Sequence, residues 1–227
     1  MDANSIRQLE PELDLFLKRF SHCFNPETEL LSTAYMRGLL SELERKNVER
    51  IALQSSISPR TLQEFLASFS CDHAGVRSTL QKIVAQDHAH PLLLMVAFSR
   101  WRVERCFEDD KKYIGMDHFE GRGYPGLIRH LILSSVSLLF LAQSRLRLKE
   151  SFPELTICQI RQATASLVQS WWLRPLDADA LINRTATQLE YYQRRNEQAR
   201  GSHTKTRNRK LLEIGIDVLQ IPKCSWG

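Results

Sequence analysis

The charged residues near the middle of the chain have the types and spacing that could do chemistry. A helix over this segment would bring two cations and two carboxylates toward one side, at three- and four-residue spacings. By this pattern alone they form ion pairs on a surface helix, with Trp101 and Phe107 facing a core. The pattern therefore predicts a salt-bridged helix, unless the carboxylates belong to a larger site. These residues are Arg100, Glu104, Glu108 and Lys111.

A second candidate is the histidine pair His88 and His90, which stands beside Asp87. Histidines two residues apart could supply ligands to a metal ion, but such a site needs a third ligand that the neighbouring sequence does not provide. The pair directly precedes Pro91. A polar loop before a proline is therefore the favoured interpretation.

The spacing Arg-x3-Glu-x6-Lys, formed by Arg100, Glu104 and Lys111, resembles a signature of bacterial insertion-sequence transposases of the DDE superfamily. The fuller signature is Tyr-x2-Arg-x3-Glu-x6-Lys, and here Ala97 stands at the tyrosine position with Phe98 beside it. The resemblance continues through GMDHFEGRGYPGLIRHLILSSVSLLFLA, which is similar to the end of the catalytic domain. Two earlier segments, RGLLSELERKNVERIA and FLASFSCDHAGVRSTL, are similar to the helical N-terminal domain of the same family. Together these segments cover most of the chain.

This resemblance implies metal-assisted cleavage and transfer of DNA strands by an RNase-H-like fold, in which three carboxylates hold two Mg²⁺ or Mn²⁺ ions. It implies that Glu104 is the third carboxylate and a metal ligand, that Lys111 contacts DNA, and that Arg100 is a supporting charge. The other two carboxylates should be Asp residues on upstream β-strands, yet residues 92–103 contain no Asp.

The missing carboxylates point to an internal deletion. A stretch of roughly 100–150 residues, about one domain, is absent between the N-terminal part and the Glu104 helix. We therefore expect a truncated transposase with its seam near residues 91–94, without the β-sheet, without a bound metal ion and without catalytic activity.

One candidate DNA contact lies in residues 48–69, which have the outline of a helix-turn-helix. A short helix around residues 48–54 is followed by a turn at 55–58 and a second helix that begins at Pro59, with Ser58 as its N-cap. Ala52 and Ile57 would pack the two helices together. A plain helical hairpin is the alternative. The residues that would face a major groove are Arg60, Thr61, Gln63 and Glu64, of which the first three are the candidate DNA contacts.

A second candidate DNA contact is the basic segment near the C-terminus. A helix is expected from Asp177 to about Arg200. Residues 184–210 contain eight Lys or Arg and two Glu, a balance of +6, which exceeds the +5 of the whole chain. Residues 201–210 lack apolar side chains, so we expect a mobile arm along a phosphate backbone or, alternatively, a solvated tail. The candidate contacts are Arg194, Arg195, Lys205, Arg207, Arg209 and Lys210.

Helical periodicity dominates the chain, which predicts a mainly α fold. We expect a helical DNA-binding-like domain at 1–90, a remnant of the catalytic domain at 91–150, and a C-terminal helical region with a basic tail at 151–227. Phosphate-binding loops of the GxxxxGK[ST] and GxGxxG types are absent from the sequence, which disfavours a nucleotide-binding enzyme. The longest apolar run, residues 131–142, is shorter than the roughly 20 residues of a membrane span and predicts a buried core helix.

The cysteines bear on the cellular compartment, and the resemblance to transposases bears on the partners. The five cysteines are dispersed and form no C-x-x-C pair, which is typical of reduced thiols in a cytoplasmic protein. The expected partner is DNA at transposon ends, and the chain could also form a homo-oligomer. The alternative function is an interaction protein that pairs with a full-length transposase and inhibits it, through Trp171, Trp172 and the helix at 131–142.

Overall fold

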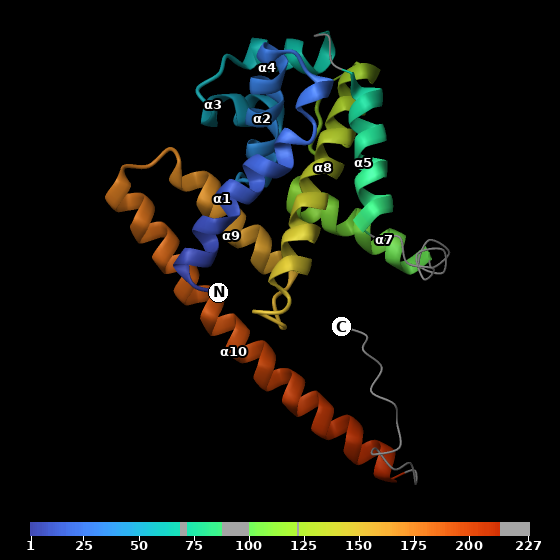
Figure 1. Cartoon of the computed structure of the whole chain (residues 1–227), viewed down its shortest axis with the longest axis vertical. Helices are drawn as coiled ribbons and strands as arrows, with labels where there is room; N and C mark the ends of the chain where they lie inside the picture. Colours follow the sequence, from blue (N-terminus) through green and yellow to red (C-terminus); the bar gives the residue numbers. More distant parts are fainter. Residues whose placement is uncertain (69–71, 88–99, 122, 214–227) are drawn as a thin grey trace.

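The structure, a computed structural model, describes residues 1–68, 72–87, 100–121 and 123–213 (Figure 1). Within these ranges no residue lies in a β-strand, so the predicted mainly α fold is confirmed. His88, His90 and the expected seam lie outside the described residues. The helices are α1 (Ala3–Lys18), η1 (Ser21–Cys23), α2 (Pro26–Leu40), α3 (Val48–Gln54), α4 (Pro59–Ala67), α5 (His73–Asp87), α7 (Arg100–Asp109), η2 (Asp110–Ile114), α8 (Tyr124–Leu148), α9 (Ile157–Ser170) and α10 (Pro175–Glu213).

Local sequence signals start several of these helices. At the start of α2 the Asn25 side chain accepts the Thr28 N–H, and the Thr28 hydroxyl accepts the Asn25 N–H. This capping box satisfies two backbone donors that the first helical turn leaves unpaired. The start of α4 differs from the expectation, because Pro59 opens the helix as predicted but the Ser58 side chain makes no capping hydrogen bond.

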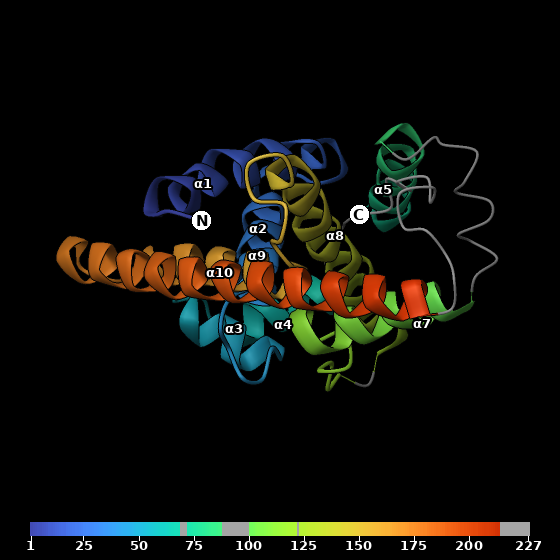
Figure 2. The same cartoon turned by 90° about the horizontal axis from the view of Figure 1, so that it is seen from below.

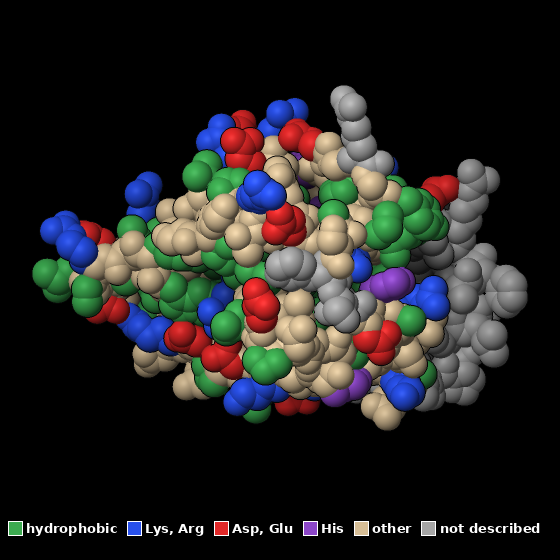
Figure 3. Space-filling model, turned by 90° about the horizontal axis from the view of Figure 1, so that it is seen from above, with side chains coloured by type: hydrophobic (Ala, Val, Ile, Leu, Met, Phe, Trp, Pro, Cys, Tyr) green, Lys and Arg blue, Asp and Glu red, His purple; other side chains and the backbone are tan. Residues whose placement is uncertain are grey.

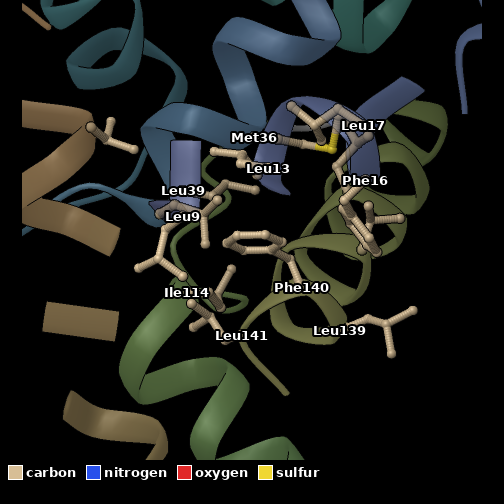
Figure 4. Packing of buried hydrophobic residues seen from close by; sticks show 14 of the residues in the cluster. Leu9, Leu13, Phe16, Leu17, Met36, Leu39, Ile114, Leu139, Phe140 and Leu141 are labelled. Carbon is tan, nitrogen blue, oxygen red and sulfur yellow. The ribbon is translucent and has the colours of Figure 1, made fainter. Parts of the chain in front are cut away.

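Helix α8 lies at the centre of the core, as the apolar run predicted. Val136, Phe140 and Leu141 are fully buried. In Figure 4 the Phe140 ring lies among side chains from α1 and η2, and its centroid is 5.5 Å from that of Phe16. By length and composition α8 could cross a membrane, but half of the relevant window is buried inside the fold. Its apolar side chains are therefore used for packing against α1, α2, α4 and α9.

All three regions expected from the sequence contribute to one continuous core. Leu13 from the first region, Phe140 from the second and Leu167 from the third belong to the same buried cluster. The N-terminal helices and α9 thus cover α8. The domain boundaries near 90 and 150 stay predictions.

A buried polar chain links α2, α8 and the segment after η2. The Tyr35 hydroxyl lies 2.7 Å from His130 Nδ1, and His130 Nε2 lies 3.0 Å from the Met116 carbonyl oxygen. Because a carbonyl only accepts, Nε2 carries the proton and Nδ1 accepts from Tyr35. Burial lowers the pKa of His130, which favours this neutral tautomer. Phe119 stacks on the same ring at 5.5 Å.

Candidate functional site

Helix α7 carries Glu104, the residue that the transposase resemblance singles out. Glu104 is exposed, and next to it Arg105 forms ion pairs with Glu108 at 3.7 Å and Asp109 at 3.4 Å. Arg100 begins the helix, but its side chain lies outside what the structure describes. Lys111 is exposed on η2, a π-helical turn. The described part of α7 is therefore an ion-paired surface helix.

The prediction that Phe107 faces a core is wrong, since its side chain is 54% exposed. Among the described elements α7 packs chiefly on η2, the turn that follows it, and it lies at the edge of the molecule in Figure 1. A side chain on this helix therefore has little to pack against. The Trp101 side chain lies outside the described part of the chain.

The two most perturbed charges near α7 were not predicted from the sequence. Lys46 is 4% exposed, and its Nζ donates to the carbonyl oxygens of Leu39 and Tyr113. Asp110 is 3% exposed, and its Oδ1 has no hydrogen-bond partner among the described residues. Burial lowers the pKa of Lys46 to about 7 and raises the pKa of Asp110 to about 7. Both residues stand in charged runs, which normally predict a solvated surface, so nothing in the sequence marks them as buried.

A metal centre does not form around Glu104 within the described residues. No group of three His, Cys, Asp or Glu side chains in the described part of the chain could hold a metal ion. Of the nearby carboxylates, Asp109 pairs with Arg105 and Asp110 is buried, away from the exposed Glu104. The described residues therefore do not fit the two-metal centre that the intact family implies.

The helices expected for the helix-turn-helix outline are present as α3 and α4. The turn between them places Ile57 so that its N–H donates to the Ala52 carbonyl oxygen at 2.9 Å, and Ala52 is buried. The inner face of α4 consists of Leu62, Phe65 and Leu66, all buried. Two helices packed in this way fit a DNA-binding motif and a plain hairpin equally well.

The outer face of α4 carries the three predicted DNA contacts. Arg60 and Gln63 are exposed, and Thr61 is half-buried. The Arg60 Nε atom donates to Glu64 Oε1 at 2.9 Å, a pair on the helix surface. A phosphate or a base edge would have to compete with Glu64 for this guanidinium.

Helix α10 is longer than predicted, and the prediction of a mobile arm at 201–210 is wrong. The helix runs from Pro175 to Glu213 without a break. Its first half is residues 175–193, and its second half, also called the basic half below, is residues 194–213. Its first half is anchored because Ile182, Ala186 and Leu189 are buried, packed on α9 and α1. Extending a helix that is already nucleated needs no apolar stripe, and residues 194–200 include Arg, Glu, Gln and Ala, which have high helix propensity. Residues 201–210 include Gly, Ser, His, Thr and Asn, which have low propensity, so there the helix depends on continuity with the anchored first half.

The second half of α10 gathers the remaining predicted DNA contacts on one exposed helix. The described residues offer only a few acidic groups to these cations, notably Glu154, which pairs with Arg200, and Glu213, which lies 3.7 Å from Arg209. Arg195 donates to the Tyr191 hydroxyl at 3.2 Å. No ion pair within the described ranges involves the cations Arg194, Lys205, Arg207 and Lys210.

The two groups of predicted DNA contacts, one on α4 and one on the second half of α10, lie far apart. In Figure 1 α4 is at the upper end of the molecule, whereas the second half of α10 extends downward beyond the other helices. Figure 2, seen from below, shows α10 crossing in front of the body. The opposite face, in Figure 3, has Lys and Arg interspersed with Asp and Glu. The structure therefore does not bring the α4 group and the basic half of α10 into one site.

Most of the surface predicted to pair with a partner protein is buried inside the fold. In the helix at 131–142 the residues Leu133, Val136 and Phe140 are buried in the core. Trp171 is partly buried, with the Arg37 guanidinium 4.4 Å from its ring centroid. Of the predicted pairing surface only Trp172, at 38% exposure, is open to a partner.

No protein-family model, curated protein or solved structure matches this chain. The resemblance to insertion-sequence transposases therefore stays a prediction. The strongest chemical feature of the described residues is the concentration of positive charge on the second half of α10.

Proposed function

We propose that this chain binds DNA through the basic half of α10, as an internally deleted remnant of an insertion-sequence transposase. The observation that carries the proposal is the charge distribution: residues 184–210 have a balance of +6 in a chain of +5. Lys and Arg that neutralise phosphates release condensed counterions, which gives affinity without base recognition. All cations of this segment are exposed and lie on one helix, so they are held at fixed spacings rather than on a flexible tail.

Helix α4 is the second part of this proposal. Arg60, Thr61 and Gln63 stand at the start of α4, the position from which a recognition helix reads base edges in a helix-turn-helix. Because α4 and the basic half of α10 are distant, one short duplex would not contact both. In this proposal α10 supplies most of the affinity and α4 any preference for sequence.

The test is a fluorescence-anisotropy titration with labelled terminal-repeat DNA at 50 to 200 mM salt. With about four to six phosphate contacts, the affinity should fall on the order of 10²- to 10³-fold over this range, with log K linear in log salt. Substituting Arg194, Lys205, Arg207 and Lys210 by Gln should flatten the slope. An affinity that ignores salt would contradict the proposal.

Loss of catalysis is a separate part of the proposal. The described residues do not fit a two-metal centre, so purified protein should not nick plasmid DNA in Mg²⁺ or Mn²⁺ above the level of the Glu104→Ala variant. Robust metal-dependent nicking that Glu104→Ala abolishes would overturn this part, while leaving DNA binding untouched.

A second candidate function is pairing with a full-length transposase to inhibit it. The observation in its favour is a small apolar corner between α9 and α10, where Trp172, Leu173 and Leu176 are 38%, 39% and 85% exposed. Co-purification of this chain with an intact relative tests it. Trp172→Ala combined with Leu176→Ala should abolish that co-purification and leave DNA affinity unchanged.

A further inference from the structure

The orientation of α10 fixes which of its cations face away from the body. At 3.6 residues per turn, Arg207 lies about five turns beyond Leu189 and so on the same side of the helix, the side that packs on the body. Residues half a turn away face outward. They form the outward row, which consists of Arg194, Gln198, Lys205 and Arg209, all exposed. Lys205 is at the edge of this row, since it also lines a hollow between α10 and residues 151–154 of the body.

Contacts to the body hold this orientation. On the inner side Asn196 Nδ2 donates to the Glu154 carbonyl oxygen at 3.4 Å, and Arg200 pairs with the Glu154 carboxylate. Both contacts lie about two to three turns beyond Leu189, which is the last buried apolar residue among those of the helix whose side chains the structure describes. They keep the outward row turned to solvent where α10 leaves the body.

The outward row has the dimensions of a groove-binding helix. From Arg194 to Arg209 it spans about 22 Å at a rise of 1.5 Å per residue. No residue between these two is a large apolar one, so the helix is slim and polar. The major groove of B-form DNA, about 12 Å wide, admits one α-helix of this kind.

Polar uncharged side chains lie between the cations of this face. Gln198 stands in the outward row, and Ser202, exposed as well, lies beside it one turn later. Gln can form paired hydrogen bonds with adenine, and Ser can bond to several bases. Arg194 and Lys205 lie on either side of them along the helix, where long cationic side chains could reach the phosphates that border the groove.

We propose that the second half of α10 enters the major groove of duplex DNA as one continuous helix, with the outward row toward the groove. The inference rests on the proposed DNA binding and adds the form of nucleic acid and the face of the helix that contacts it. Gln198 and Ser202 then face base edges, Arg194, Lys205 and Arg209 contact phosphates or guanine, and the Glu154 contacts stay on the protein side.

The form of nucleic acid separates this mode from general attraction to phosphate. The full chain is titrated with three labelled probes of one sequence: duplex DNA, duplex RNA and single-stranded DNA. The major groove of duplex RNA is too deep and narrow for a helix, and a single strand has no groove. We expect duplex DNA to bind at least 10-fold more tightly than either other probe.

Two sets of variants, equal in charge, test the face of the helix. Arg194→Gln, Lys205→Gln and Arg209→Gln together should weaken duplex binding at least 10-fold and remove the preference over RNA. Lys18→Gln, Arg19→Gln and Lys82→Gln remove the same charge from exposed positions around α1 and α5 and should change affinity less than 3-fold. Circular dichroism of all variants checks that the helices remain.

The outcomes distinguish the inference from the proposed function. No binding to any probe would refute the proposed function and the inference together. Equal affinity for the three probes, or equal loss from the two sets of variants, would leave nucleic-acid binding standing and overturn groove insertion by α10.

Discussion

The two halves of α10 belong to one unbroken helix but differ in what surrounds them. In the first half Ile182, Ala186 and Leu189 are buried against α9 and α1, whereas every described cation in the second half is exposed. Burial of apolar side chains stabilises the first half, and helix propensity with continuity from the first half carries the second. One half thus anchors the helix, and the other is available to a ligand.

The largest difference between the halves should appear on side-chain truncation. Leu189 is fully buried, so Leu189→Ala should lower the free energy of unfolding by about 2–5 kcal/mol, from lost burial and the cavity that remains. Gln198→Ala, its control in the second half, should change the free energy by less than about 0.5 kcal/mol. Urea unfolding followed by circular dichroism measures both. Similar losses in the two variants would show that the second half is packed as tightly as the first.

Buried and exposed charges should also respond differently to pH. The pKa of Lys46 is lowered to about 7, so unfolding takes up a proton between about pH 7 and the ordinary lysine value. Stability should therefore rise with pH above 7, by up to about 1.4 kcal/mol per pH unit. The pKa of Asp110 is raised to about 7, so between the ordinary Asp value and pH 7 the folded state holds a proton that the unfolded state releases. In that range stability should fall as the pH rises. Stability from this pair is thus lowest near neutral pH.

The pair can be isolated by comparing unfolding of the wild type and Lys46→Met from pH 7 to 9. The variant should lack the rise in stability that the wild type shows. The matched substitution in the second half of α10, Lys205→Met, should leave that rise unchanged, because Lys205 is exposed. A rise of equal size in all three proteins would mean that Lys46 keeps its charge in the fold up to pH 9, so that its pKa is not lowered.

The smallest effect is expected at Gly201, in the second half of α10. A Cβ there meets no atom within 4 Å, so Gly201→Ala should stabilise that part of the helix by about 0.5–1 kcal/mol. Amide hydrogen exchange of residues 194–210 should slow. Gly38→Ala is the contrasting variant, because its Cβ would collide with the Ile51 side chain and destabilise the core. Slower exchange only in the first half would contradict the expectation.

Several features could be predicted because their causes are local. The apolar run at 131–142 predicted the core helix α8, and Pro59 after a turn predicted the start of α4. Other features depend on residues distant in the sequence. Lys46 is buried because its Nζ reaches the Tyr113 carbonyl oxygen, 67 positions later, and Phe107 is exposed because α7 lies at the edge of the fold.

The candidate site also combines features with local causes and features that depend on residues distant in the sequence. The cations of residues 194–210 could be predicted from composition, but their helical arrangement could not, because residues 201–210 lack the apolar stripe that marks a packed helix. The outward row exists only because residues upstream, such as Leu189, fix the rotation of α10 about its axis. For Glu104, the resemblance to transposases implied a catalytic carboxylate, whereas partners for a metal site depend on tertiary structure that the described residues do not provide.

The end of α4 has a consequence for the order of events during synthesis. Arg129 on α8 donates to the carbonyl oxygens of Phe65 and Leu66 at 3.0 and 2.8 Å. These carbonyls close α4, yet their donor leaves the ribosome more than 60 residues later. The C-terminal end of α4 therefore gains these two hydrogen bonds only after α8 has emerged and docked, so a chain interrupted before Arg129 would lack them.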